Sequence, residues 1–114
     1  MFRVTIGDLT FRSVAERMVV EERDGRRRNA VLDVPTAAIE SLEVARTRPT
    51  DGALRRLPFQ RRRFGQARSQ TGIVVRLRGG ERRYFVVLGR PESVLTALRP
   101  LVEDVRRSGG SVLV

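Results

Sequence analysis

A cluster of arginines in the middle of the chain is the feature with the clearest chemistry. Six of them lie in the segment 52–70 and are candidate anion-binding residues: Arg55, Arg56, Arg61, Arg62, Arg63 and Arg68. A guanidinium binds a phosphate or carboxylate through two parallel hydrogen bonds. From Gly52 to Gly80 the chain contains eight arginines and no Asp or Glu. This asymmetry indicates an anionic partner, and the alternative is a solvated loop that only improves solubility.

Two aromatic residues lie among these arginines. Phe59 and Phe64 are candidates for stacking on nucleic-acid bases or for wedging between lipid headgroups. The alternative is that both side chains anchor the segment to the core of the domain.

Several residue types that enzymes commonly use are missing. The sequence has no Cys and no His, and all 23 of its basic residues are Arg. Zinc sites built on Cys or His, Cys nucleophiles, His general bases and Schiff-base lysines are therefore excluded. No glycine-rich phosphate-binding spacing occurs either. We expect a protein that is not an enzyme and has no cofactor or metal. A GC-rich genome would also favour Arg over Lys, so the all-Arg usage by itself does not indicate a function.

The composition is that of one globular domain, residues 1–114. Hydrophobic residues make up 40% of the chain and charged residues 32%, with a net charge of +10. No apolar run approaches the ~20 residues that a membrane-spanning helix needs, and the first residues lack the apolar core of a signal peptide. We therefore expect a cytoplasmic protein, located in the cytosol or peripherally on the inner face of the membrane.

The elements that would position the arginines are mostly strands. Seven segments are predicted to be strands, some from the alternation of apolar and polar residues that marks a half-buried strand, others from short runs of Val, Tyr and Phe. These segments are Phe2–Ile6, Leu9–Arg12 after a break or bend at Gly7-Asp8, Glu16–Arg23, Arg27–Val34, Ile39–Thr47, Ile73–Arg78 and Glu81–Leu88. Asp24-Gly25 and Gly79-Gly80 are hairpin-turn signals. Pro58 and Gly65 make the segment between Leu54 and Gln70 the least regular part.

The C-terminal part of the chain has a helical period. Val94, Leu98, Leu101, Val102 and Val105 lie on one face of a helix that begins near Pro91 and stops at Gly109-Gly110. Pro100 lies inside this run and should kink or split the helix. Val112 to Val114 follow the helix stop, and we expect them to add a short edge strand or to pack on a second copy, making a homo-oligomer.

The predicted fold is therefore mainly β with one C-terminal helix. We expect about seven antiparallel strands in a small barrel or sandwich that the helix plugs.

Three stretches of the sequence resemble the bacterial pleckstrin-homology (PH) domain family. Asn29–Ala45 is similar to the family's strand, Pro-x-x-x-Ile corner and next strand; Thr71–Arg83 to its late hairpin; and Gly89–Leu98 to the start of its capping helix. The resemblance implies a PH-like barrel of two near-orthogonal sheets capped by a helix.

The resemblance also bears on where a ligand would bind. Phosphoinositide-binding relatives in the wider superfamily carry basic residues around the first hairpin loop. Here that region offers only Arg12 and Arg17, with Glu16 between them, and the basic residues lie in the middle of the chain instead.

We therefore predict a binding module that docks to an anionic surface through the segment 52–70. The surface would be lipid headgroups or an acidic partner protein. One alternative is nucleic-acid binding by the same Arg and Phe residues. The other is a structural or assembly subunit that uses a sheet edge or the apolar tail.

Overall fold

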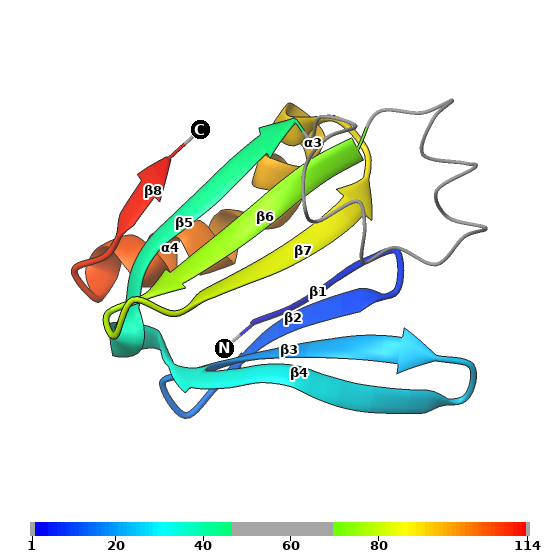
Figure 1. Cartoon of the computed structure of the whole chain (residues 1–114), viewed down its shortest axis with the longest axis horizontal. Coiled ribbons are helices and arrows are strands. Elements are labelled where there is room, and N and C mark those ends of the chain that lie inside the picture. The colour runs from blue at the N-terminus through cyan, green and yellow to red at the C-terminus, as the bar shows by residue number, and fades with distance from the viewer. Residues whose placement is uncertain (1, 47–69, 114) are drawn as a thin grey trace.

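The chain folds into two four-stranded sheets and two helices (Figure 1). The structure, a computed structural model, describes residues 2–46 and 70–113. The first sheet is an antiparallel meander of β1 (Phe2–Ile6), β2 (Leu9–Val14), β3 (Arg17–Asp24) and β4 (Arg27–Pro35). A 3-10 turn, η1 (Thr36–Ala38), leads to the second sheet, which has the order β7-β6-β5-β8. Its strands are β5 (Ile39–Arg46), β6 (Gln70–Leu77), β7 (Arg82–Leu88) and β8 (Ser111–Leu113).

The turns explain how the strands alternate in direction. Gly25 and Gly80 have φ of +61° and +92°, so the predicted hairpins at Asp24-Gly25 and Gly79-Gly80 are confirmed. Gly7-Asp8 forms a complete hairpin turn rather than a bend. The turn between β2 and β3 carries no glycine: Ala15 and Glu16 both have positive φ, at 50° and 63°. This left-handed backbone costs about 1 kcal/mol or more per residue, so the sequence held no signal for it.

The core lies between the two sheets. Phe11 of β2 and Phe85 of β7 meet edge to face, with ring centroids 6.0 Å apart and an interplanar angle of 80°. Edge-to-face aromatic pairs of this kind stabilise the fold by more than the burial of their apolar surface alone would. Buried Val, Leu and Ile side chains from both sheets surround the pair. Because side chains alternate between the two faces of a strand, each sheet has one apolar face, and the two apolar faces pack together in a shared core.

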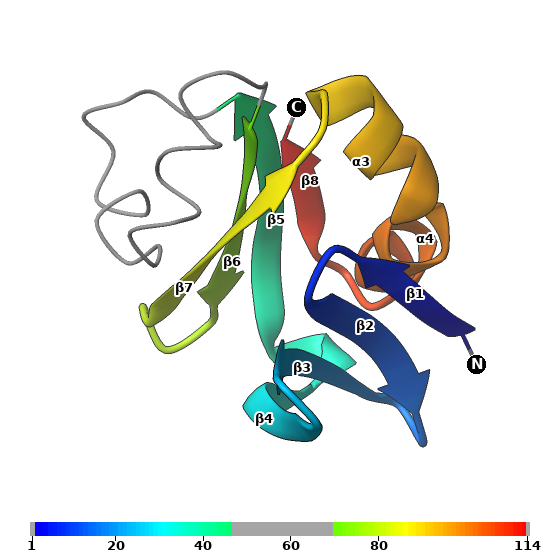
Figure 2. The same ribbon diagram turned by 90° about the vertical axis from the view of Figure 1, so that its right-hand side faces the viewer.

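Two helices, not one, close the open side between the sheets. They are α3 (Pro91–Ala97) and α4 (Arg99–Arg107), and they meet at Leu98, which is fully buried. Figure 2 shows them spanning the gap between β1 and the β5–β8 side of the second sheet. The break confirms the effect expected of Pro100, which lies in the first turn of α4, where its missing N–H is harmless. All five apolar residues of the predicted helical stripe are buried.

The predicted barrel does not close, and the number of strands is slightly higher than the seven or so that the sequence predicts. Among the described residues there are eight strands, and no ladder joins the two sheets. Although β5 follows β4 directly along the chain, it does not pair with β4, because one edge of β5 pairs with β6 and the other with β8. Because β8 runs parallel to β5, the second sheet is mixed rather than antiparallel.

The C-terminal tail is held by the molecule itself. Val112 and Leu113 of β8 lie opposite Leu42 and Glu43 of β5, so the predicted edge strand is confirmed. Gly110 makes this possible, because a Cβ at that position would lie 2.7 Å from Val105 Cγ1 and 2.8 Å from the carbonyl oxygen of Ile39. The chain can therefore pass from α4 into β8 only where no side chain is present.

Substituting Leu98 tests whether the helices plug the core. We expect Leu98→Asp to lower the free energy of unfolding by several kcal/mol, because it buries an unpaired carboxylate. Urea denaturation would measure the change. Ser93→Asp, which places the same charge on the exposed side of α3, is the control and should change stability little. A Leu98→Asp variant as stable as the control would disprove the plug.

Gly110 gives a second test, directed at the tail. We expect Gly110→Ala to cost about 1–3 kcal/mol, because Val105 and the β5 backbone must move to admit the methyl group. Gly79→Ala is the matched control: Gly79 has no neighbour within 4 Å and no positive φ. Hydrogen exchange at Val112 and Leu113 would show whether β8 has detached. Equal stability of the two variants would mean that the tail does not depend on this close approach.

Candidate functional site

The predicted arginine site lies outside the described residues. Arg55, Arg56, Arg61, Arg62, Arg63, Arg68, Phe59 and Phe64 all fall within residues 47–69. The structure does describe where this segment is attached. β5 and β6 are antiparallel neighbours with Arg46 opposite Thr71, so the segment leaves and rejoins the second sheet at the same end (Figure 1).

The stretch from Gly52 to Gly80, which contains no Asp or Glu, has two further arginines in the part of the chain that the structure describes, and these two differ in role. Arg78 is structural, because its Nε donates a hydrogen bond to the carbonyl oxygen of Ala37 at 2.8 Å and ties the β6–β7 turn to η1. Arg76 is exposed on the outer face of the second sheet, and its side chain forms no ion pair or hydrogen bond with the described residues. This stretch therefore contains both a structural arginine and an arginine that remains available to bind an anion.

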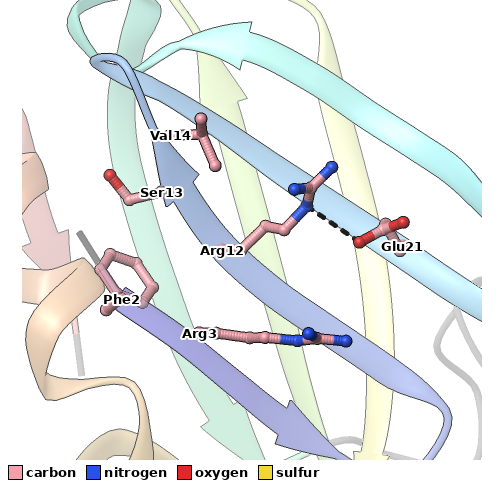
Figure 3. Close-up of a pocket in the computed structure, with 6 residues that line it drawn as sticks. All are labelled: Phe2, Arg3, Arg12, Ser13, Val14 and Glu21. Carbon is pink, nitrogen blue, oxygen red and sulfur yellow. Dashed lines mark ion pairs between the residues drawn. The ribbon is translucent and has the colours of Figure 1, made fainter.

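The structure also shows a site that sequence analysis missed. An open depression of about 510 Å³ lies against the first sheet. Six residues line it: Phe2, Arg3, Arg12, Ser13, Val14 and Glu21 (Figure 3).

Strand register brings two arginines together in this depression. Leu9, Phe11 and Ser13 of β2 point toward the core, so Arg12 points outward. Arg3 of β1 lies directly opposite Arg12, and Figure 3 shows the two side chains extending alongside one another. Like charges in this position on neighbouring strands repel each other. A two-residue turn at Gly7-Asp8 already implies this pairing, so the turn was the signal that could have revealed it.

Only one of the two arginines has an acidic partner. Arg12 Nε lies 2.9 Å from Glu21 Oε1, whereas the side chain of Arg3 forms no ion pair or hydrogen bond within residues 2–46 and 70–113. The buried Nε–H of Arg12 is not aimed at an acceptor, so the ion pair rests on charge attraction rather than on an aligned hydrogen bond. Arg3 is therefore the guanidinium that remains available to an external carboxylate or phosphate.

A second ion pair extends this charged face. Arg17 Nε donates to Asp33 Oδ1 at 2.9 Å, and Arg17 also reaches the Asp33 carbonyl oxygen at 3.3 Å. Val19 lies between Arg12 and Asp33 in the strand register and is only 8% exposed, although it is on the outer face. Charged side chains cover apolar surface with their methylene stems, which accounts for this burial.

The tip of the β3–β4 hairpin is the third basic surface. Residues 22–30 are exposed throughout, and Arg26, Arg27 and Arg28 have no side-chain partner among the described residues. Glu22 and Asp24 offset part of this charge, whereas Glu21 is paired with Arg12. In Figure 1 the tip projects at the lower right, whereas the ends of β5 and β6 that flank residues 47–69 lie at the top. The hairpin tip is therefore a separate, partly neutralised basic surface.

Comparison with known proteins does not add to this assignment. No family model, no curated protein and no solved structure matches the chain. Among residues 2–46 and 70–113, no three acidic side chains lie close enough together to hold a metal ion. In the same part of the chain, every helix is too short or too polar to cross a membrane.

Reversing the charge of Arg3 tests whether its guanidinium and that of Arg12 repel each other. We expect Arg3→Glu to raise the free energy of unfolding by roughly 0.5 kcal/mol, because attraction to Arg12 replaces repulsion at an exposed site. Arg3→Gln should produce part of this gain, and 1 M salt should remove most of it. If Arg3→Glu is less stable than the wild type in low salt, the two guanidinium groups do not oppose each other.

Proposed function

We propose that this protein is a non-enzymatic binding module that docks to an anionic surface through the arginine-rich segment 52–70. The anionic groups would be lipid headgroups, with the protein peripheral on the inner face of the membrane, or the carboxylates of an acidic partner protein. The observation that carries the proposal is the excess of arginine between Gly52 and Gly80, where eight arginines are accompanied by no carboxylate. Such an excess of positive charge in one stretch of the sequence attracts anionic partners.

The position of the segment in the fold supports the proposal. Because β5 and β6 are paired neighbours, the chain leaves the second sheet after Arg46 and re-enters the same sheet at Gln70, at one end of it. The β3–β4 tip adds a second exposed basic surface with Arg26, Arg27 and Arg28. Several guanidinium groups displayed together attract polyanions with little stereospecificity and with strong salt dependence.

We further propose that the fold is a variant of the PH-like architecture. The support is the division of the strands into a meander β1–β4 and a meander β5–β7, followed by helices placed between the two sheets. The differences are the open barrel, the split helix and the added strand β8.

Removing three arginines tests the docking proposal. We expect Arg61→Ala, Arg62→Ala and Arg63→Ala together to weaken binding to vesicles containing 30% anionic lipid roughly a hundredfold, since each arginine near an anionic membrane contributes about 1 kcal/mol. Vesicle sedimentation would measure this, and rising salt should bring the variant and the wild type together.

A charge-matched control separates a specific site from net charge. Arg82→Ala, Arg99→Ala and Arg106→Ala together remove the same charge from exposed positions on β7 and α4. This control should bind nearly as well as the wild type. Equal weakening of both variants would show that only the total charge matters and would refute a docking site at 52–70.

The same variants distinguish the kind of anion. Binding to a polyglutamate peptide but not to vesicles would indicate that the partner is an acidic protein rather than a membrane. Preferential binding of single-stranded nucleic acid, weakened by ~1–3 kcal/mol in Phe59→Ala or Phe64→Ala, would overturn the proposal in favour of base stacking.

A further inference from the structure

The outer edges of the two sheets are protected to very different degrees. Exposed edge strands offer unpaired backbone groups to other chains, and proteins normally guard them with charge, proline, shortness or a covering element. α3 packs against β1, and β8 is only three residues long. β4 carries Arg27, Arg28, Asp33 and Pro35. Among the described edges, β7 is the one that lacks comparable protection.

β7 is well suited to accept another strand. It is seven residues long, contains no proline and has no hydrogen-bonded partner other than β6 in the described part of the chain. Its only charged residues are Arg82 and Arg83, which leaves the uncharged run Tyr84–Leu88. Figure 2 shows α3 and α4 on the side of the second sheet away from β7. The backbone edge of this run is therefore not covered by either helix.

The side chains of the run already have fixed orientations. Phe85 and Val87 are buried in the core, so the inward side of β7 is anchored. Tyr84 and Leu88 are 41% and 50% exposed on the outer face, with the half-buried Val86 between them. An added strand would thus meet a rigid edge flanked by apolar side chains, which lowers the entropic cost of pairing.

We propose that β7 pairs antiparallel with β7 of a second copy of this chain, centred on Val86. The pairing would join two four-stranded sheets into one continuous sheet across a two-fold axis. Tyr84 of each copy would lie opposite Leu88 of the other, and Val86 opposite Val86. Aromatic and β-branched residues in such cross-strand positions stabilise antiparallel pairs.

The placement of charge along β7 argues for a second copy in this orientation. Arg82 and Arg83 precede the uncharged run, so an antiparallel partner separates the two Arg82-Arg83 pairs to opposite ends of the interface. There Arg83 lies opposite Gly89 of the other copy, and Arg82 faces Arg90, which lies just beyond the end of the strand. A parallel pairing would instead place Arg82 against Arg82 and Arg83 against Arg83, which is unfavourable. The run is therefore self-complementary only when the second copy is inverted.

This location differs from the oligomer contact expected at the C-terminal tail. One edge of β8 is already paired with β5, and the strand offers only three residues. Leu113 is 53% exposed on the outer face, at the opposite margin of the same sheet from β7. Leu113 therefore provides a control of similar exposure and chemistry at the other edge.

Sedimentation equilibrium of the full chain tests the proposal. We expect the mass to approach twice 12.9 kDa as concentration rises. Because each copy carries +10, added salt should strengthen the dimer, the opposite of its effect on anion docking. The dimer and the docking site can therefore fail independently.

Two matched variants locate the interface. Tyr84→Lys should raise the dimer dissociation constant at least about tenfold, because it puts a charge at the apolar contact. Leu113→Lys adds the same charge at the other edge and should leave the constant unchanged. The proposal is overturned if the wild type stays monomeric at millimolar concentration in 0.5 M salt, or if Leu113→Lys rather than Tyr84→Lys dissociates the dimer.

Cross-linking tests the register without disturbing the apolar contact. The chain has no cysteine, so Val86→Cys introduces a single thiol. Opposed residues in an antiparallel pair are close enough for a disulfide, and mild oxidation should link this variant to itself. Leu113→Cys should remain unlinked under the same conditions. Equal linking of both variants, or of neither, would refute the pairing, even if Tyr84→Lys proved too unstable to study.

Discussion

Strand β5 is the element on which the rest of the structure depends, because both of its edges and its inner face are occupied. β6 pairs with one edge and β8 with the other, while α3 and α4 pack against it. η1 joins it directly to the first sheet. With both edges used, β5 cannot pair with β4, the strand that precedes it in the chain, and side chains from the helices fill the open side between the sheets. The outer strands of the second sheet are then β7 and β8.

Arginine serves several physical roles in this chain, and burial and partners distinguish them. Arg78 supports a turn through a backbone carbonyl, and Arg12 and Arg17 form ion pairs across strands while their stems cover apolar surface. Arg3, Arg26 and Arg76 have no partner and contribute to the external field. The net charge of +10 thus attracts anions and opposes self-association. Salt screens both effects, so the two proposed interactions respond to it in opposite directions.

Local patterns in the sequence predicted most of the elements. Alternation located the strands, Gly25 and Gly80 located two turns, and Pro100 marked the break between α3 and α4. These signals are local because they depend on side-chain period and on backbone φ. The turn at Ala15-Glu16 had no such signal, since it is imposed by the pairing of β2 with β3 against the preference of its residues. The candidate site was predicted only as far as the arginines of segment 52–70, which lie outside the described residues.

The sequence by itself determined a mainly β chain, the absence of Cys, His and Lys chemistry, and a concentration of arginine between Gly52 and Gly80. These follow from composition and short-range spacing. Only the tertiary structure decided that the barrel stays open, that β8 pairs parallel with β5, and that Phe11 of the first sheet meets Phe85 of the second. Each depends on which strand edges meet, and that choice is governed by the free energy of burying the whole core at once. A pattern of alternating residues identifies a strand and its faces, but it does not select the strand's neighbours.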